Sequence, residues 1–143
     1  MKVQILFFVC CAFFSGAANS ESLRSITVQT SDCFTCGMTL GDLGIQICGT
    51  DNCCSIQALD NDDLNFVPGG TDVFIGADLG DCYDYYLGSA SEPLKVTLYH
   101  VGSDAVTLDL VMIETTTRYA NCWIESELDN DDIFKTECDA EKH

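Results

Sequence analysis

Short apolar runs with a period of two constrain the fold of this chain more than any other feature. Hydrophobic and polar residues alternate in residues 25–30 (SITVQT) and 43–48 (LGIQIC), a spacing that sends successive strand side chains to opposite faces. Five further runs lie at 71–75, 83–87, 95–101, 108–113 and 119–124, rich in β-branched and aromatic residues. Clusters of Gly, Asp, Asn and Ser separate them. Many short strands between turns predict a single all-β domain, an antiparallel sandwich or barrel.

The first twenty residues resemble a secretory signal peptide. Lys2 precedes an unbroken apolar run at 5–14, and small residues follow at 15–20. The apolar run is too short to span a bilayer, which takes about 20 residues. We therefore predict a signal peptide at 1–20, cleaved after Ser20 or alternatively after Ala18. The product is expected to be a secreted, extracellular domain of residues 21–143 with no transmembrane segment.

Cysteine content predicts a disulfide-rich domain. The chain has ten cysteines, and two of them, Cys10 and Cys11, lie in the signal peptide. The other eight are expected to form up to four disulfides in an oxidising compartment. They are Cys33, Cys36, Cys48, Cys53, Cys54, Cys82, Cys122 and Cys138. Their pairing stays open, except that the neighbouring Cys53 and Cys54 are expected to bond to different partners.

The spacing of Cys33 and Cys36 also occurs in redox and zinc sites. A redox site of this type needs a following helix, and a zinc site needs a second pair of ligands. The sequence predicts neither, so a disulfide is the preferred interpretation of this pair.

Acidic residues dominate the charge. The chain carries 23 Asp and Glu against 6 Lys and Arg, a net charge of −17. Such a charge repels nucleic acid and anionic lipid, so no nucleic-acid partner is expected. Contact with a membrane would need a bridging cation or a local apolar tip. Because 47% of the residues are hydrophobic, the high charge does not indicate disorder.

A series of short motifs follows one order along nearly all of residues 25–135. It consists of 26–30, 37–39, 45–49, 58–61, 66–69, 72–74, 79–81, 96–99, 108–113 and 122–124. In this order the chain resembles the PLAT domain (polycystin, lipoxygenase, alpha-toxin). The resemblance implies an antiparallel β-sandwich of two roughly four-stranded sheets, similar to a C2 domain, that binds through loops at one end. The chain departs from the family at residues 39–41, which read Thr-Leu-Gly in place of Thr-Asp-Ala, and in its additional cysteines.

The acidic loop at residues 60–63 is the candidate Ca²⁺ site. Ca²⁺ takes six to eight oxygen ligands, which clustered carboxylates and amides provide. The resemblance implies that the first loop faces this one, and the candidate ligands are Gly37, Thr39, Asp42, Asp60, Asn61, Asp62 and Asp63. The alternative is a solvated acidic loop, because acidic clusters are common in a chain this acidic. A second acidic run, 129–132, is a weaker candidate, and neither run has the spacing of an EF-hand.

The first loop also carries apolar residues. Phe34 lies between Cys33 and Cys36, and Met38 and Leu40 follow, so these three are the candidate membrane-contact residues. The alternative is that Phe34 folds back onto the sandwich.

Residues with catalytic potential are few. His100 lies on a predicted strand with no nucleophile motif, and His143 is the last residue, so no enzyme activity is expected. Trp123 is expected in the core by its match to the family, with a sugar-stacking surface as the alternative. We predict a secreted, non-enzymatic binding module for a lipid surface or an extracellular protein partner, with Ca²⁺ as the candidate cofactor. The alternative is an acidic, cross-linked structural protein of an extracellular matrix, with no small ligand.

Overall fold

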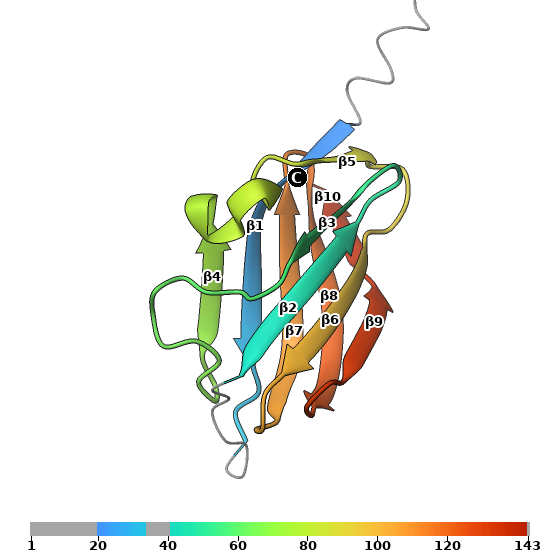
Figure 1. Cartoon of the computed structure of the whole chain (residues 1–143). Helices are drawn as coiled ribbons and strands as arrows, with labels where there is room; N and C mark the ends of the chain where they lie inside the picture. The colour runs from blue at the N-terminus through green and yellow to red at the C-terminus, as the bar shows by residue number, and fades with distance from the viewer. Residues whose placement is uncertain (1–19, 34–40, 143) are drawn as a thin grey trace, which may run out of the picture.

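The structure, a computed structural model, describes residues 20–33 and 41–142 (Figure 1). The predicted signal peptide lies outside these residues except for its last residue, Ser20, which opens the first strand. Within the described ranges the chain forms ten strands and one short 3₁₀ helix. The elements are β1 (Ser20–Thr30), β2 (Asp42–Cys48), β3 (Cys53–Ile56), β4 (Thr71–Ile75), η2 (Gly76–Cys82), β5 (Tyr86–Ser89), β6 (Lys95–Val101), β7 (Val106–Thr115), β8 (Arg118–Leu128), β9 (Ile133–Glu137) and β10 (Asp139–Lys142).

The strands form two antiparallel sheets, which confirms the predicted sandwich. The larger sheet has six strands, in the order β10-β8-β7-β1-β4 with β5 also paired to β1, and the smaller has the order β3-β2-β6-β9. Sheets of about four strands each were expected. The larger sheet exceeds that number because two four-residue strands, β5 and β10, add to its edges. No helix in the described parts of the chain is long and apolar enough to cross a bilayer.

The core lies between the two sheets and follows the predicted alternation. Ile26 and Val28 of β1 face Leu43, Ile45 and Ile47 of β2 in one buried cluster, and all five are at most 1% exposed. This burial is the main stabilising term for the sandwich, at about 1.5–3 kcal/mol for each large apolar side chain. The period-two pattern in the sequence therefore identified the inner faces of these strands correctly.

The predicted strand at residues 83–87 is wrong in its first half. η2 ends at Cys82, and Asp84 takes a left-handed conformation with a φ of 61°. The amide of Tyr85 donates to the carbonyl of Cys82 in a turn, so β5 begins only at Tyr86. The alternation of tyrosines here does not mark a buried face, because Tyr83, Tyr85 and Tyr86 are all exposed.

Three disulfides join described cysteines. Cys48–Cys53 closes the β2–β3 hairpin, Cys54–Cys82 joins β3 to η2, and Cys122–Cys138 joins β8 to the segment before β10. Cys53 and Cys54 thus bond to different partners, as predicted. Cys33 is also disulfide-bonded, whereas Cys36 lies outside the described residues.

A buried ion pair fastens the start of β1 to the turn between β7 and β8. Arg118 Nε and Nη2 donate to Glu21 Oε2 and Oε1 at 2.9 and 2.6 Å. Thr115 Oγ1 donates to Glu21 Oε2 at 3.0 Å, and Arg118 Nη2 also donates to the carbonyl of Glu92 at 2.8 Å. Glu21 is 1% exposed and Arg118 is 5% exposed. A buried pair is tolerated when further hydrogen bonds satisfy its polar atoms, and here the Thr115 hydroxyl and the carbonyl of Glu92 contribute two of them.

Removing one partner of this pair is expected to destabilise the domain strongly. Arg118→Met leaves the Glu21 carboxylate buried without a counter-charge, which costs about 3–5 kcal/mol of unfolding free energy. Urea unfolding followed by circular dichroism measures the loss. The control is Glu21→Leu/Arg118→Met, which removes both charges and should recover much of the stability. A double variant as unstable as Arg118→Met would contradict this account.

Candidate functional site

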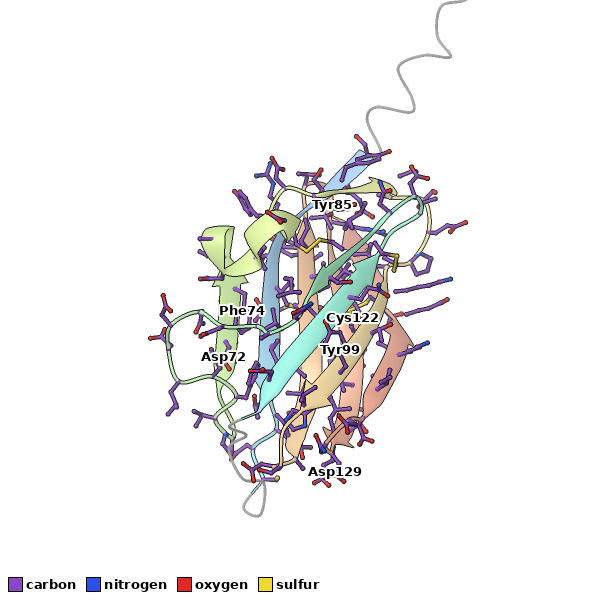
Figure 2. All side chains as sticks on the ribbon, in the orientation of Figure 1. Asp72, Phe74, Tyr85, Tyr99, Cys122 and Asp129 are labelled. Atoms are coloured by element: carbon purple, nitrogen blue, oxygen red, sulfur yellow. A yellow bond between two sulfur atoms is a disulfide. The ribbon has the colours of Figure 1, made fainter. Side chains whose placement is uncertain are left out.

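The candidate site is one end of the sandwich, which we call the loop end. The start of β2, the loop 57–70, the turn 102–104 and the acidic run 129–132 lie there (Figure 2). Asp129 lies at this end and Tyr85 at the opposite one (Figure 2). An acidic hollow of about 210 Å³ at the loop end is lined by Gly41 and Asp42 at the start of β2 and by residues of the loop 57–70, among them Asp60 and Asn65. The structure therefore brings together two of the predicted Ca²⁺ ligands, Asp42 and Asp60, from segments that are far apart in the sequence.

A close backbone approach positions Asp42. A Cβ atom on the preceding residue, Gly41, would lie 2.5 Å from the carbonyl oxygen of Val101 and 2.8 Å from the Cα atom of Gly102. Only glycine fits where the start of β2 passes the turn after β6. Asp42 consequently lines a second hollow on this side as well, with Val101 and Asp104.

Hydrogen bonds to the body of the sandwich shape the loop 57–70. The amide of Leu59 donates to the carbonyl of Leu43 at 2.9 Å, and Asn61 Nδ2 donates to the carbonyl of Val73 at 3.1 Å. The amide of Phe66 donates to Asp72 Oδ2 at 2.8 Å. These bonds fix the two sides of the loop, so that its tip projects outward.

Internal hydrogen bonds hold the tip of that loop. Asp60 Oδ1 accepts the amide of Asp62 at 3.0 Å and Asn65 Nδ2 at 3.2 Å, and Asn61 Oδ1 accepts the amide of Asp63 at 3.2 Å. Asn65 Oδ1 is buried and has no hydrogen-bond partner among the described residues. The hollow thus contains an acceptor without a donor beside two carboxylates.

The described residues supply part of a Ca²⁺ site. Asp42, Asp60 and Asn65 offer fewer than the six to eight oxygens that Ca²⁺ takes. No group of three or more His, Cys, Asp or Glu side chains in residues 20–33 and 41–142 is placed to hold a metal. Asp62 and Asp63 are exposed and Asn61 is partly buried. Gly37 and Thr39 lie outside the described residues, so the full predicted ligand set stays a prediction.

Apolar residues are exposed at the loop end. The predicted membrane-contact residues Phe34, Met38 and Leu40 lie outside the described part of the chain. Leu64 is 67% exposed at the edge of the acidic hollow, and Val67 and Val101 are also exposed. None of these three was predicted from the sequence. Leu64 could have been noticed, because it is an isolated apolar residue that follows four polar residues without any alternation.

His100 is a structural histidine, as predicted. Its side chain is fully buried, and its Nδ1 lies 3.2 Å from the carbonyl oxygen of Asp129. Its backbone also bonds to Asp131 and Asp132, so that β6 holds the acidic run 129–132 against the sheet. The imidazole thus packs between β6 and the acidic run in the interior of the sandwich.

Exposed tyrosines occupy the end opposite the loop end. The guanidinium of Arg24 lies 5.8 Å from the ring centroid of Tyr83 and donates to its hydroxyl. The hydroxyl of Tyr86 donates to Asp51 Oδ2 at 3.2 Å, and this bond raises the pKa of Tyr86 above its ordinary value. Burial raises the pKa of Tyr99, whose hydroxyl donates to the carbonyl of Ile56 at 2.9 Å. The raised pKa values keep the phenols of Tyr86 and Tyr99 neutral over the physiological pH range.

The predicted core position of Trp123 is wrong, because its side chain is 52% exposed. Trp123 lies on the solvent-facing side of the larger sheet, which we call the outer face, while its neighbours Cys122 and Ile124 are buried. A bulge follows directly, where β7 and β8 shift register and Glu125 has a φ of 46°. The alternation of β8 points the Trp123 side chain to solvent, whereas the resemblance to the PLAT domain predicted that it points into the core.

Strand pairing defines three rows of residues on the outer face. Each row runs from β4 through β1 and β7 to β8, and the first two continue to β10. The rows are Ile75–Ser25–Glu114–Tyr119–Glu141, Val73–Thr27–Met112–Asn121–Asp139 and Thr71–Gln29–Leu110–Trp123.

No model of a known protein family matches this chain, and no curated protein matches it. The PLAT resemblance therefore stays a prediction.

Asp72 is expected to control the shape of the loop end. Asp72→Ala removes the charged acceptor of the Phe66 amide, which costs about 1.5–3 kcal/mol of unfolding free energy. It should also increase protease cleavage within residues 60–67, because Phe66 (φ 57°) loses the bond that holds its conformation. Asp72→Asn keeps an acceptor oxygen and is the control. Equal cleavage of both variants and of the unchanged protein would show that Asp72 does not hold the loop.

Proposed function

We propose that this protein is a secreted, non-catalytic binding module that attaches to a lipid surface through its loop end, with Ca²⁺ assisting. The observation that carries the proposal is the exposure of Leu64, 67%, at the edge of a hollow lined by Asp42 and Asp60. Insertion into a membrane would remove the Leu64 side chain from water, which is favourable, and a bound cation would neutralise the carboxylates beside it. Three disulfides among the described cysteines accord with an extracellular location.

The charge of the protein explains why a cation belongs to the proposal. With 23 acidic residues the chain is repelled from anionic lipid headgroups over about a Debye length, roughly 8 Å at physiological ionic strength. Ca²⁺ held between the carboxylates of the hollow and lipid phosphates turns this repulsion into attraction. Leu64, Val67 and Val101 then contribute by burying apolar surface.

A non-catalytic role is supported by the burial and the disulfide bonding of residues that often act in catalysis. His100 is enclosed in the sandwich, and the three described disulfides occupy six of the cysteines that would otherwise be candidate nucleophiles.

Vesicle binding tests the role of Leu64. Leu64→Ser is expected to weaken co-sedimentation with phosphatidylserine-containing vesicles by about tenfold, since burial of a leucine side chain contributes about 1.5–3 kcal/mol. Ile75→Ser is the control, because Ile75 is 57% exposed at the end of β4 that leads into η2, away from the loop end. An equal effect of both variants would argue against insertion of the loop end. Absence of vesicle binding by the unchanged protein would overturn the lipid proposal, and a protein partner at the same loops would then be the remaining candidate.

Calorimetry tests the role of Ca²⁺. We expect saturable heat of Ca²⁺ binding in the range of about 0.1–1 mM, as in weak extracellular sites, and its loss in Asp60→Ala. Glu141→Gln is the control, because Glu141 is an exposed carboxylate on β10, which lies toward the opposite end of the sandwich (Figure 1). Equal heats from all three proteins would mean that the acidic loops are only solvated. Concentration-dependent sedimentation without ligand would instead favour the matrix alternative.

A further inference from the structure

The three rows of the outer face carry little charge in a very acidic protein. Of their positions on β4, β1, β7 and β8, Glu114 is the only charged one, and its carboxylate accepts a hydrogen bond from Ser25 Oγ at 2.8 Å. Other exposed carboxylates lie around these rows, at Asp139 and Glu141 of β10 and, beyond Trp123, at Asp109 of β7 and Glu125 and Glu127 of β8. A centre without charge inside an acidic rim is the arrangement of a protein–protein interface, in which charged residues are depleted from the core.

Aromatic and apolar side chains occupy the centre of this face. Trp123 and Tyr119 of β8 are 52% and 42% exposed, and Met112 of β7 is partly buried beside them. On β4, Val73 and Ile75 are 46% and 57% exposed. Tryptophan, tyrosine and methionine are enriched in interface cores, and tryptophan and tyrosine are frequent hot spots.

Asn121 lies between the two aromatic residues, and the oxygen of its side-chain amide accepts no hydrogen bond from the described residues. It is two residues from both Tyr119 and Trp123, and thus on the same side of β8. Its Oδ1 is buried and has no hydrogen-bond partner among the described residues. A buried acceptor without a donor destabilises the free protein. It indicates a ligand that donates hydrogen bonds.

The hollow at the end of this face is also suited to a cationic side chain. It has a volume of about 780 Å³, and its lining includes Ser25, Ile75 and Glu114 from the first row of the outer face. Arg24 at its border is already engaged by Tyr83 and by Asp84 at 3.4 Å. Glu114 is therefore the carboxylate of this hollow that a cation from a partner would meet.

We propose that the outer face of the larger sheet is a docking surface for a basic protein, with an arginine of that partner stacked on Trp123. A guanidinium stacks on indole faces and donates hydrogen bonds but accepts none, which matches both Trp123 and the unpaired Asn121. The net charge of −17 and the acidic rim attract such a partner. A second copy of this chain has the same strong negative charge and the same acidic rim, so it is disfavoured as the occupant.

Fluorescence of Trp123 gives a direct test, because it is the only tryptophan of the chain. The probes are nona-arginine and nona-lysine peptides, titrated into the protein at physiological salt. We expect saturable binding that changes Trp123 emission and is tighter for nona-arginine, because arginine stacks on indole better than lysine does. Binding that leaves Trp123 emission unchanged would overturn the proposal.

Matched variants separate docking at this face from diffuse attraction to an acidic protein. Trp123→Ala, followed by anisotropy of labelled nona-arginine, should weaken binding about tenfold or more, as hot-spot tryptophans do. Tyr85→Ala at the end beyond β5 should not. Asp139→Asn/Glu141→Gln should weaken binding more than Asp62→Asn/Asp63→Asn, which removes the same charge from the loop end. Equal weakening by the two double variants would mean diffuse attraction and overturn the proposal.

Asn121 provides a readout that a purely structural role would not give. Asn121→Val removes the unpaired acceptor and adds a β-branched residue to a strand, so the midpoint of urea unfolding should rise. The same variant should bind nona-arginine more weakly. Loss of stability together with unchanged binding would contradict the role given to Asn121.

Neutral oligosaccharides are the competing occupant, because sugars also stack on tryptophan. Cellohexaose and chitohexaose are therefore titrated in the same fluorescence assay. A saturable change in Trp123 emission with either sugar, and none with nona-arginine, would assign the outer face to a neutral glycan and overturn the proposal.

Discussion

The buried pair of Glu21 and Arg118 is the interaction on which the larger sheet depends. Arg118 opens β8, and Glu21 lies near the start of β1, the strand that pairs with β4, β5 and β7. A carboxylate and a guanidinium with almost no exposed surface are stable only in one geometry. The pair therefore sets the position of β1 relative to the β7–β8 hairpin, and with it the alignment of every row on the outer face.

The sequence predicted the parts of this fold that depend on local pattern. The alternation in residues 25–30 and 43–48 predicted which side of each strand is buried, because the side-chain period of a strand is two. The bonding of Cys53 and Cys54 to different partners also followed from local geometry. The ion pair could not be predicted, because Glu21 and Arg118 are 97 residues apart and nothing in the sequence distinguishes them from other charged residues.

The candidate sites were predictable to a smaller extent. The acidic run at 60–63 and Asp42 were identified from residue type, and the structure places Asp42 and Asp60 at one hollow. The outer face was not foreseen, because its composition emerges only when four strands from distant parts of the chain are aligned. Trp123 shows the limit: the resemblance placed it in the core, whereas its position in the alternation of β8, between the buried Cys122 and Ile124, puts it on the outer face.

Residues near both ends of the described chain contact Arg118. The side chain of Arg118 binds Glu21, and its backbone pairs with Lys142 of β10. Both ends of the domain thus lie at the pole opposite the acidic loops (Figure 1). A tether or fusion partner joined at either end would emerge there and leave the loop end free to face a surface. The short gap between the ends also makes the domain a natural candidate for circular permutation, with a new opening in an exposed loop.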